Sequence, residues 1–224
     1  MEVQVVTDVL AKNDAIADTL QRTFAEKGIF VFNLLGSPGA GKTSLLEATL
    51  TELSKTYRLA VIEGDLYTDK DADRIERLGV PVLQINTVGG CHLDAAMIEK
   101  AVAAMDLDAL DMIIIENVGN LVCPAEFAIG EAMKVTVLSV TEGEDKPLKY
   151  PLIFKESAAV LLNKVDLLPY IPFDKEKAIA DIHMLHPQAA VFEVSCTAKT
   201  GLDAWIAWLS ERIEAQRKGA ACKE

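Results

Sequence analysis

A glycine-rich segment of the sequence has residue types that suit phosphate binding. It reads GSPGAGKT over residues 36–43 and follows a continuous apolar run at residues 29–35. The glycines let successive backbone N–H groups point at phosphate oxygens, Lys42 supplies a full positive charge, and the Thr43 hydroxyl can bind Mg²⁺. The alternative is a turn that only joins a strand to a helix. The position between strand and helix favours a nucleotide phosphate site made by Gly36, Ser37, Gly39, Ala40, Gly41, Lys42, Thr43 and Ser44.

A second segment, NKVD at residues 163–166, has residue types that recognise guanine. Asp166 can accept hydrogen bonds from the ring N–H and the exocyclic amine of guanine, whereas adenine would leave this carboxylate unpaired. Asn163 can bind the other edge of the base and brace the phosphate loop, while the Lys164 stem can cover the ring. NKVD is also an ordinary loop sequence, but its place after an apolar run favours a guanine nucleotide. Backbone N–H groups that could meet the guanine oxygen belong to Ser195, Cys196 and Thr197.

Two acidic residues lie at or just beyond the ends of predicted strands, where Mg²⁺ and the γ-phosphate of a nucleotide would lie. Asp65 ends VIEGD, and Glu116 ends an isoleucine run and is followed by Gly119, as in the second switch segment of GTPases. A carboxylate there can hold a metal-bound water or orient the attacking water. We predict catalytic roles for Lys42, Asp65 and Glu116, and Mg²⁺ ligands in Thr43 and Asp65; the alternative is a solvated acid at a strand end. Because no glutamine is placed to orient water, we expect slow intrinsic hydrolysis, typical of a switch.

A further group of residues, Cys91, His92 and Cys123, has side chains of types that bind Zn²⁺ or Ni²⁺. Cys91 and His92 are adjacent at the predicted start of a helix over residues 92–105, and a helix N-terminus lowers the pKa of a thiol. Thiolate and imidazole ligands suit both metals, so the choice between Ni²⁺ and Zn²⁺ stays open. The alternative is that the cysteines are buried and free. Three ligands are an incomplete set, which a two-fold dimer could pool across its interface.

The segments that carry these motifs need a scaffold in which apolar strands alternate with helices. The pattern predicts an α/β fold, the three-layer αβα P-loop NTPase, with a mostly parallel sheet of about seven strands. Ligands of such sheets bind beyond the carboxyl ends of the strands. We expect an N-terminal helix at residues 1–28 and a P-loop GTPase domain at residues 29–224, in a single domain overall. Strands are predicted at residues 29–35, 59–63, 82–85, 111–116, 134–140, 158–162 and 191–194, and helices at residues 5–27, 43–55, 69–78, 92–105, 175–186 and 202–217.

The composition of the chain limits its partners and its location. Among 224 residues, 34 are acidic and 22 are basic, which gives a net charge of −12. This field repels phosphate backbones and anionic lipids, so we expect neither nucleic acid nor a membrane as a partner. The first residues lack the pattern of a secretory signal, and no apolar stretch approaches the roughly 18 residues that span a bilayer. With four unclustered cysteines, these features indicate a soluble, cytoplasmic protein.

The combination of motifs resembles the HypB family, the nickel-incorporation GTPases of hydrogenase maturation, which are SIMIBI-class P-loop GTPases. The shared blocks are GSPGAGKT, EGD, CHLDA, ENVGNLVCP, TEGEDKPLKYP and NKVD. The resemblance implies a homodimeric metal-binding GTPase that uses GTP/GDP, Mg²⁺ and Ni²⁺ or Zn²⁺ and helps deliver nickel to NiFe hydrogenase. It also implies Cys91, His92 and Cys123 as the metal site, and a companion nickel metallochaperone and the hydrogenase large subunit as partners. Because Cys123 lies close after Glu116, we expect the nucleotide state to be coupled to metal binding.

Three other functions compete with this interpretation. A sibling metallochaperone GTPase could serve urease or a cobalamin enzyme, but urease relatives carry a Cys-Pro-His arrangement in place of CHLDA followed by NLVCP. A small-molecule kinase of the P-loop class is disfavoured by NKVD. A metal-storage protein without enzymatic activity would show no GTP turnover.

Some parts of the sequence depart from the family pattern or stay without a role. Some HypB members carry a cysteine motif or a histidine-rich segment near the N-terminus, but residues 1–28 contain neither cysteine nor histidine. We therefore expect no nickel-storage role. Cys222 has no predicted role, and residues 141–150, which include Lys146 and Lys149, could border the nucleotide or a dimer interface.

Overall fold

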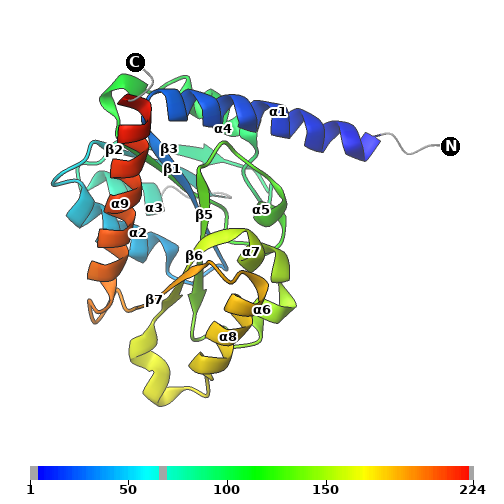
Figure 1. The fold of residues 1–224 in the computed structure, drawn as a ribbon, viewed down its shortest axis with the longest axis vertical. Helices are drawn as coiled ribbons and strands as arrows, with labels where there is room; N and C mark the ends of the chain where they lie inside the picture. Colours follow the sequence, from blue (N-terminus) through cyan, green and yellow to red (C-terminus); the bar gives the residue numbers. More distant parts are fainter. Residues whose placement is uncertain (1–4, 66–69, 222–224) are drawn as a thin grey trace.

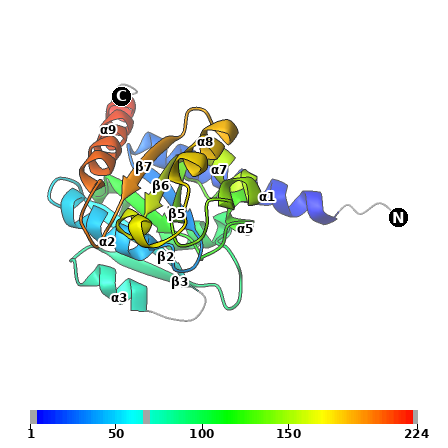
Figure 2. The same cartoon turned by 90° about the horizontal axis from the view of Figure 1, so that it is seen from below.

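A parallel β-sheet forms the centre of the molecule (Figure 1). The computed structural model describes residues 5–65 and 70–221, and within them the sheet has seven strands in the order β3-β2-β4-β1-β5-β6-β7. Every neighbouring pair is parallel. Helices cover both faces of the sheet (Figure 2), so the predicted three-layer αβα fold is confirmed. The strands are β1 (Phe30–Gly36), β2 (Leu59–Asp65), β3 (Val82–Asn86), β4 (Met112–Glu116), β5 (Met133–Ser139), β6 (Ser157–Asn163) and β7 (Ala190–Val194).

The helices form two layers because successive side chains of the central strands point to opposite faces. Phe32 of β1 points to one face and contacts the Trp205 ring of α9 edge-on, with 6.0 Å between ring centroids. Val31 points to the other face and packs with Leu20 of α1 and Ile98 of α4. The helices are α1 (Val5–Glu26), α2 (Lys42–Leu53), α3 (Lys70–Glu76), α4 (Ala95–Val102), α5 (Cys123–Glu126), α6 (Lys146–Lys149), α7 (Pro151–Glu156), α8 (Lys175–Leu185) and α9 (Leu202–Ala221), with 3₁₀ helices η1 (Leu107–Ala109) and η2 (Val165–Tyr170).

The carboxyl ends of the central strands meet at one edge of the sheet. Gly36, the last residue of β1, begins the phosphate loop. Glu116, the last residue of β4, lies in register with Leu34 of β1 and with Glu63 of β2. Asn163, the first residue of NKVD, ends β6. The fold therefore brings three predicted motifs to the same edge.

The predicted elements are in place, but their ends differ and some short helices were missed. The helix predicted over residues 92–105 begins at Ala95, because the Asp94 side chain caps it by accepting a hydrogen bond from the Met97 N–H at 2.8 Å. The short helices α5, α6 and α7 are absent from the prediction. Each has a proline in its first turn, where the fixed φ of proline suits a helix start.

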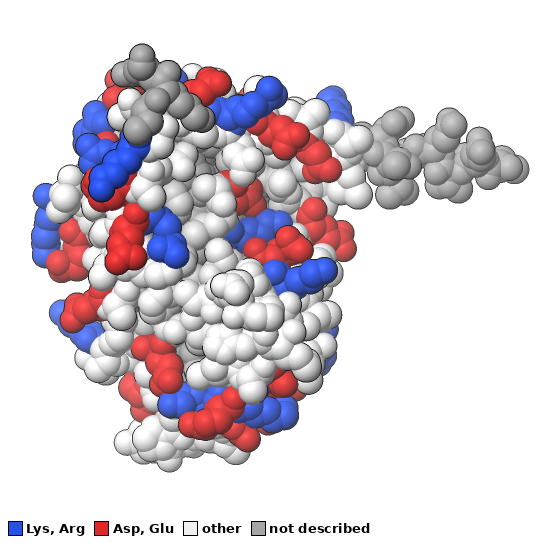
Figure 3. Space-filling model, viewed as in Figure 1, with Lys and Arg blue, Asp and Glu red and all other residues white. Residues whose placement is uncertain are grey.

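Charged side chains of both signs are interspersed over the face shown in Figure 3, with an uncharged area around α7 and α8. Exposed apolar side chains on these two helices are Leu152 and Met184. No helix within residues 5–65 and 70–221 is long and apolar enough to cross a membrane. Acidic and basic side chains are thus mixed on this face, and neither sign forms a large patch there.

Candidate nucleotide and metal sites

A cavity of about 500 Å³ lies at the carboxyl edge of the sheet, above the ends of β2 and β4. The phosphate loop forms one side of it, and the residues between Glu116 and Gly119 form another. Lys42, Thr43, Asp65, Glu116 and Lys164 line it, as do Asp71 and Arg74 of α3. The structure therefore brings the predicted phosphate-binding, Mg²⁺-binding and switch residues to one cavity.

The phosphate loop and NKVD are held together by direct hydrogen bonds. The Asn163 side-chain amide donates to the Ala40 carbonyl at 2.9 Å, and the Lys164 ammonium donates to the Gly39 carbonyl at 2.7 Å. Gly41 has φ of 96°, and a Cβ atom there would lie 2.4 Å from the Asn163 amide nitrogen. Only glycine therefore fits at this point of the loop. The contact between Asn163 and the loop is the bracing contact that the sequence predicts.

The predicted guanine end of the site lies beside this contact. The Cys196 thiol lies 3.7 Å from the Asn163 side-chain oxygen, and burial raises the pKa of that thiol. Ser195 is fully buried, and its hydroxyl accepts a hydrogen bond from the Ala198 N–H at 3.0 Å. This bond tightens the turn that contains Thr197. The turn and the NKVD segment are thus adjacent, as the guanine interpretation requires.

A buried pair of carboxyl groups lies under the cavity. The Thr43 hydroxyl donates to Glu116 Oε1 at 3.0 Å, and Glu63 lies in register with Glu116 on the next strand. Burial and the neighbouring Glu116 raise the pKa of Glu63 to about 10. Burial raises the pKa of Glu116 to about 7 against the opposing effect of Lys42. The Oε2 atoms of Glu63 and Glu116 are buried and have no hydrogen-bond partner.

Sequence reasoning missed Glu63 as a site residue. A signal existed, because Glu63 lies two positions before Asp65 in EGD, so both side chains point to the same face of β2. The partner Glu116 could be found only from the strand order, which places β2 beside β4.

Without nucleotide, the free energy of unfolding should fall as the pH rises. We expect this fall to be smaller in Glu63→Gln than in the wild type. An unfolded Glu63 releases its proton near its ordinary pKa of 4.5, whereas the folded protein retains the proton up to about pH 10. Between these values the folded state binds more protons, so the free energy of unfolding falls by about 1.4 kcal/mol per pH unit for one such group. Glutamine has no proton to release, so the fall should be smaller in the variant.

Urea unfolding at pH 6 and pH 8 measures this difference. Glu52→Gln on α2 is the matched control, because the Glu52 side chain is half exposed and pairs with Lys55. An equal fall in the wild type and in Glu63→Gln contradicts the prediction.

Glu142 is a second residue that the sequence did not single out. It lies in residues 141–150, the segment left without a role. Its carboxylate accepts hydrogen bonds from the Ser37 hydroxyl and from the Ser139 N–H. This segment therefore borders the phosphate loop.

The three residues of the predicted metal site are close together. One ligand atom from each of Cys91, His92 and Cys123 lies within 4.8 Å of the others. The Cys91 sulfur is 3.5 Å from His92 Nδ1, and the His92 ring packs at a tilt of 31° against the Phe127 ring, with 4.0 Å between centroids. Burial lowers the pKa of His92, which favours the neutral imidazole that binds metals. The arrangement can offer two thiolates and one imidazole to a metal ion.

The prediction that Cys91 and His92 start a helix is wrong. They lie in the loop before α4, which begins at Ala95. The expected lowering of the thiol pKa is also wrong, because a hydrogen bond with Cys123, burial and the charge of Cys123 raise the pKa of Cys91. Cys222 lies outside the described residues.

Comparison with known proteins identifies the family. Residues 30–193 match the CobW/HypB/UreG nucleotide-binding domain. The hydrogenase maturation factor HypB of Escherichia coli K12 is 52% identical over 206 residues, which cover 92% of this chain and 71% of that protein. The crystal structure of HypB from Helicobacter pylori in complex with nickel superposes with a TM-score of 0.87 at 38% identity, over 92% of this chain and 97% of that one. HypB from Archaeoglobus fulgidus superposes with a TM-score of 0.85 at 34% identity, over 91% of this chain and 100% of that one. The chain therefore belongs to the CobW/HypB/UreG family, within which its sequence and its fold match the HypB proteins.

Proposed function

We propose that the protein hydrolyses GTP to GDP and phosphate and couples this nucleotide cycle to the binding of nickel that is delivered to NiFe hydrogenase. One observation carries the proposal: residues 116–123 connect the two candidate sites. At one end, Glu116 accepts a hydrogen bond from Thr43 of the phosphate loop. At the other end, Cys123 lies in the cluster with Cys91 and His92. The HypB relatives, which are named hydrogenase maturation factors, supply the biological context.

The phosphate loop would hold the β- and γ-phosphates with its backbone N–H groups and with Lys42, whose ammonium lies 3.4 Å from the Gly36 and Ser37 carbonyls. NKVD, through Asp166, would select guanine. Since hydrolysis depends mainly on positioning and on stabilising negative charge, these contacts account for much of the catalysis.

The donor set around Thr43 fits Mg²⁺. Hydroxyl, carboxylate and water oxygens are the ligands that Mg²⁺ prefers, and the buried oxygens of Glu63 and Glu116 that lack a partner favour a cation nearby. Thr43 and Asp65 would hold the ion, which neutralises charge on the phosphates when bound. Glu116 would orient the attacking water. These assignments rest on the shared cavity and on the chemistry of the side chains.

The Cys91, His92 and Cys123 cluster would hold the nickel that is carried, and the same ligands accept Zn²⁺. Square-planar coordination would favour nickel, and tetrahedral coordination would favour zinc. A homodimer would complete the ligand set across a two-fold axis. Exposed apolar residues close to the ligands in the sequence support this interface: Val88, three residues before Cys91, is 79% exposed, and Val122, directly before Cys123, is 50% exposed.

The proposed partners are a companion nickel metallochaperone, which would hand over the metal, and the hydrogenase large subunit, which would receive it. We place this exchange in the cytoplasm. The rival functions differ in simple observables. A metal-storage protein would release no phosphate from GTP, and a small-molecule kinase would need an acceptor. Maturation assays of hydrogenase and urease in a deletion strain separate the two metallochaperone roles.

Nickel titration of the wild-type protein tests the proposed coupling. We expect nickel affinity with Mg²⁺ and GDP to differ at least about fivefold from nickel affinity with Mg²⁺ and a non-hydrolysable GTP analogue, the lower end of usual coupling. Linkage requires that nickel change nucleotide affinity by the same factor. Size measurement alongside reports the dimer, and phosphate release without an acceptor reports the GTPase. Equal nickel affinity in both nucleotide states contradicts the coupling.

A further inference from the structure

Two asparagines in residues 116–123 hold the backbone on both sides of His92. Asn117 Oδ1 accepts a hydrogen bond from the Leu93 N–H at 3.1 Å. The Asn120 amide donates to the Cys91 carbonyl at 3.2 Å, and its Oδ1 accepts from the Val122 N–H at 2.9 Å. The two side chains therefore fix the peptide units before and after His92, and Asn120 also fixes the residue before Cys123.

The same two asparagines are bonded to the strand and to the loop of the nucleotide site. Asn117 directly follows Glu116, and its backbone N–H donates to the Leu34 carbonyl of β1 at 3.0 Å. The Asn120 N–H donates to the Gly36 carbonyl, at the start of the phosphate loop, at 3.1 Å. Hydrogen bonds of Asn117 and Asn120 therefore connect the nucleotide site to the backbone that carries Cys91 and His92. A displacement of residues 116–123 would move that backbone as well.

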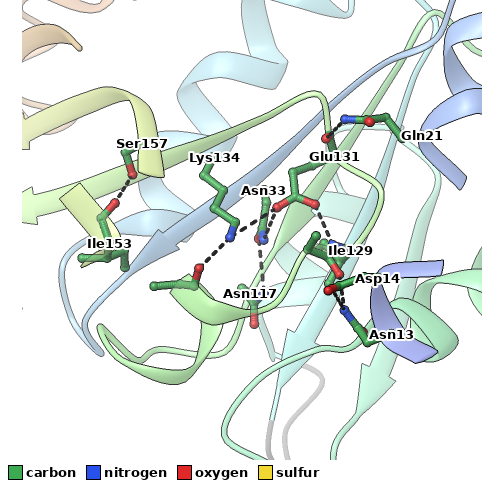
Figure 4. Close-up of polar contacts among 12 residues, drawn as sticks. Asn13, Asp14, Gln21, Asn33, Asn117, Ile129, Glu131, Lys134, Ile153 and Ser157 are labelled. Atoms are coloured by element: carbon green, nitrogen blue, oxygen red, sulfur yellow. Dashed lines mark hydrogen bonds and ion pairs between the residues drawn. The ribbon is translucent and has the colours of Figure 1, made fainter. Parts of the chain in front are cut away.

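Asn117 has a fixed orientation because it is only 1% exposed and belongs to a buried polar network (Figure 4). Its amide donates to Asn33 Oδ1 at 3.2 Å, and the Asn33 amide donates to Glu131 Oε1 at 3.4 Å. Glu131 in turn accepts from the Ile129 N–H at 2.7 Å. The Glu131 carboxylate only accepts, so the Asn33 side chain must turn its amide to Glu131 and its oxygen to the Asn117 amide. This leaves Asn117 Oδ1 facing the Leu93 N–H.

We propose that Asn117 and Asn120 are positioning residues that transmit the nucleotide state to the Cys91–His92–Cys123 cluster. The inference rests on the proposed function, because it needs nucleotide and metal to be coupled. When the segment after Glu116 responds to the γ-phosphate, the two amides move the Cys91–Leu93 backbone with it. Asn117 lines the nucleotide cavity, but its side-chain oxygen and amide are bonded to Leu93, Val118 and Asn33. In this scheme neither asparagine side chain is a ligand of the nucleotide or of the metal. Their loss should uncouple the two sites and leave both able to bind.

The test compares the wild type with an Asn117→Ala/Asn120→Ala double variant. The measured quantity is the ratio of the nickel dissociation constant with Mg²⁺ and GDP to that with Mg²⁺ and a non-hydrolysable GTP analogue. We expect this ratio to differ from one by at least about fivefold in the wild type and to lie within about twofold of one in the double variant. The thiolate-to-nickel absorption band should respond to the analogue in the wild type and stay unchanged in the variant.

Asn13→Ala is the matched control. Asn13 is also a buried asparagine, and its Oδ1 accepts from the Ala95 N–H, at the start of α4, at 2.9 Å. Its amide donates to the Ala128 carbonyl at 2.8 Å, so its side-chain bonds do not reach residues 116–123. This variant removes a comparable bond near the cluster and should keep the wild-type ratio.

Each outcome decides one point. A wild-type ratio of one contradicts the proposed function itself. A coupled wild type with an equally coupled double variant overturns the role of the asparagines and leaves the proposed function in place. Loss of coupling in Asn13→Ala also overturns their specific role. If the buried Asn117→Ala change prevents folding, Asn120→Ala alone should still bring the ratio at least about threefold closer to one, and an unchanged ratio counts against the inference.

Discussion

Lys42→Ala is expected to lower kcat for GTP hydrolysis at least about 100-fold, because removing one group that stabilises developing negative charge costs about 10²–10³ in rate. Lys42 is only 8% exposed and is the first residue of α2. Its ammonium lies against the carbonyls at the start of the phosphate loop. GTP affinity should fall as well, since the same charge opposes the phosphates in the ground state. Phosphate release under single-turnover and steady-state conditions separates the two effects.

Lys55→Ala is the matched control for this prediction. Lys55 lies just beyond α2, is 61% exposed and pairs with Glu52 at 2.6 Å. Alanine is a good helix former, so Lys42→Ala should keep its helical circular dichroism. Normal GTP hydrolysis by Lys42→Ala would show that the phosphate loop is not the reaction site.

Lys42 also links the nucleotide to the buried carboxyl pair. Its positive charge lowers the pKa of both Glu63 and Glu116, although burial raises them more. A site that keeps a proton on a carboxyl group in the absence of a cation can exchange that proton for a bound cation. Such an exchange would let a chain of net charge −12 hold an anionic nucleotide, since the local groups rather than the overall field set the charge at the cavity.

The sheet could be predicted because its central strands are buried on both faces and read as continuous apolar runs. In β4, Ile113, Ile114 and Ile115 have no exposed surface. The phosphate loop and NKVD could be predicted as well, because each needs particular residue types in a short, contiguous segment. These features depend on residues that are neighbours in the sequence, so the sequence alone is enough to predict them.

Contacts between distant segments that no sequence motif marks could not be predicted. The pairing of Glu63 with Glu116 depends on the order of β2 and β4, and the hydrogen bond from Leu93 to Asn117 joins two separate loops. The start of α4 is a different case, because Asp94 in CHLDA is a residue type that caps helices. That local signal was available in the sequence, but the prediction began the helix two residues before it, at His92.

Cys91→Ala and Cys123→Ala are each expected to lower nickel affinity at least about 100-fold. Loss of a residue that only orients a metal ligand costs about 10–100-fold in affinity, and loss of a ligand removes a coordination bond as well. The three ligand atoms lie within 4.8 Å of one another, so no member of the cluster can be replaced without leaving a gap. Competition with a chromophoric chelator measures the affinity, and the thiolate-to-nickel absorption band should weaken in parallel.

The loss of nickel binding should also affect dimer formation. If each protomer contributes an incomplete ligand set, nickel should promote the dimer in the wild type and fail to do so in Cys91→Ala. His183→Ala is the matched control, since His183 lies on the exposed side of α8, outside the cluster. It should keep the wild-type affinity. Wild-type nickel affinity in both cysteine variants would contradict the metal site, and a nickel-independent dimer would show that nickel does not drive dimer formation.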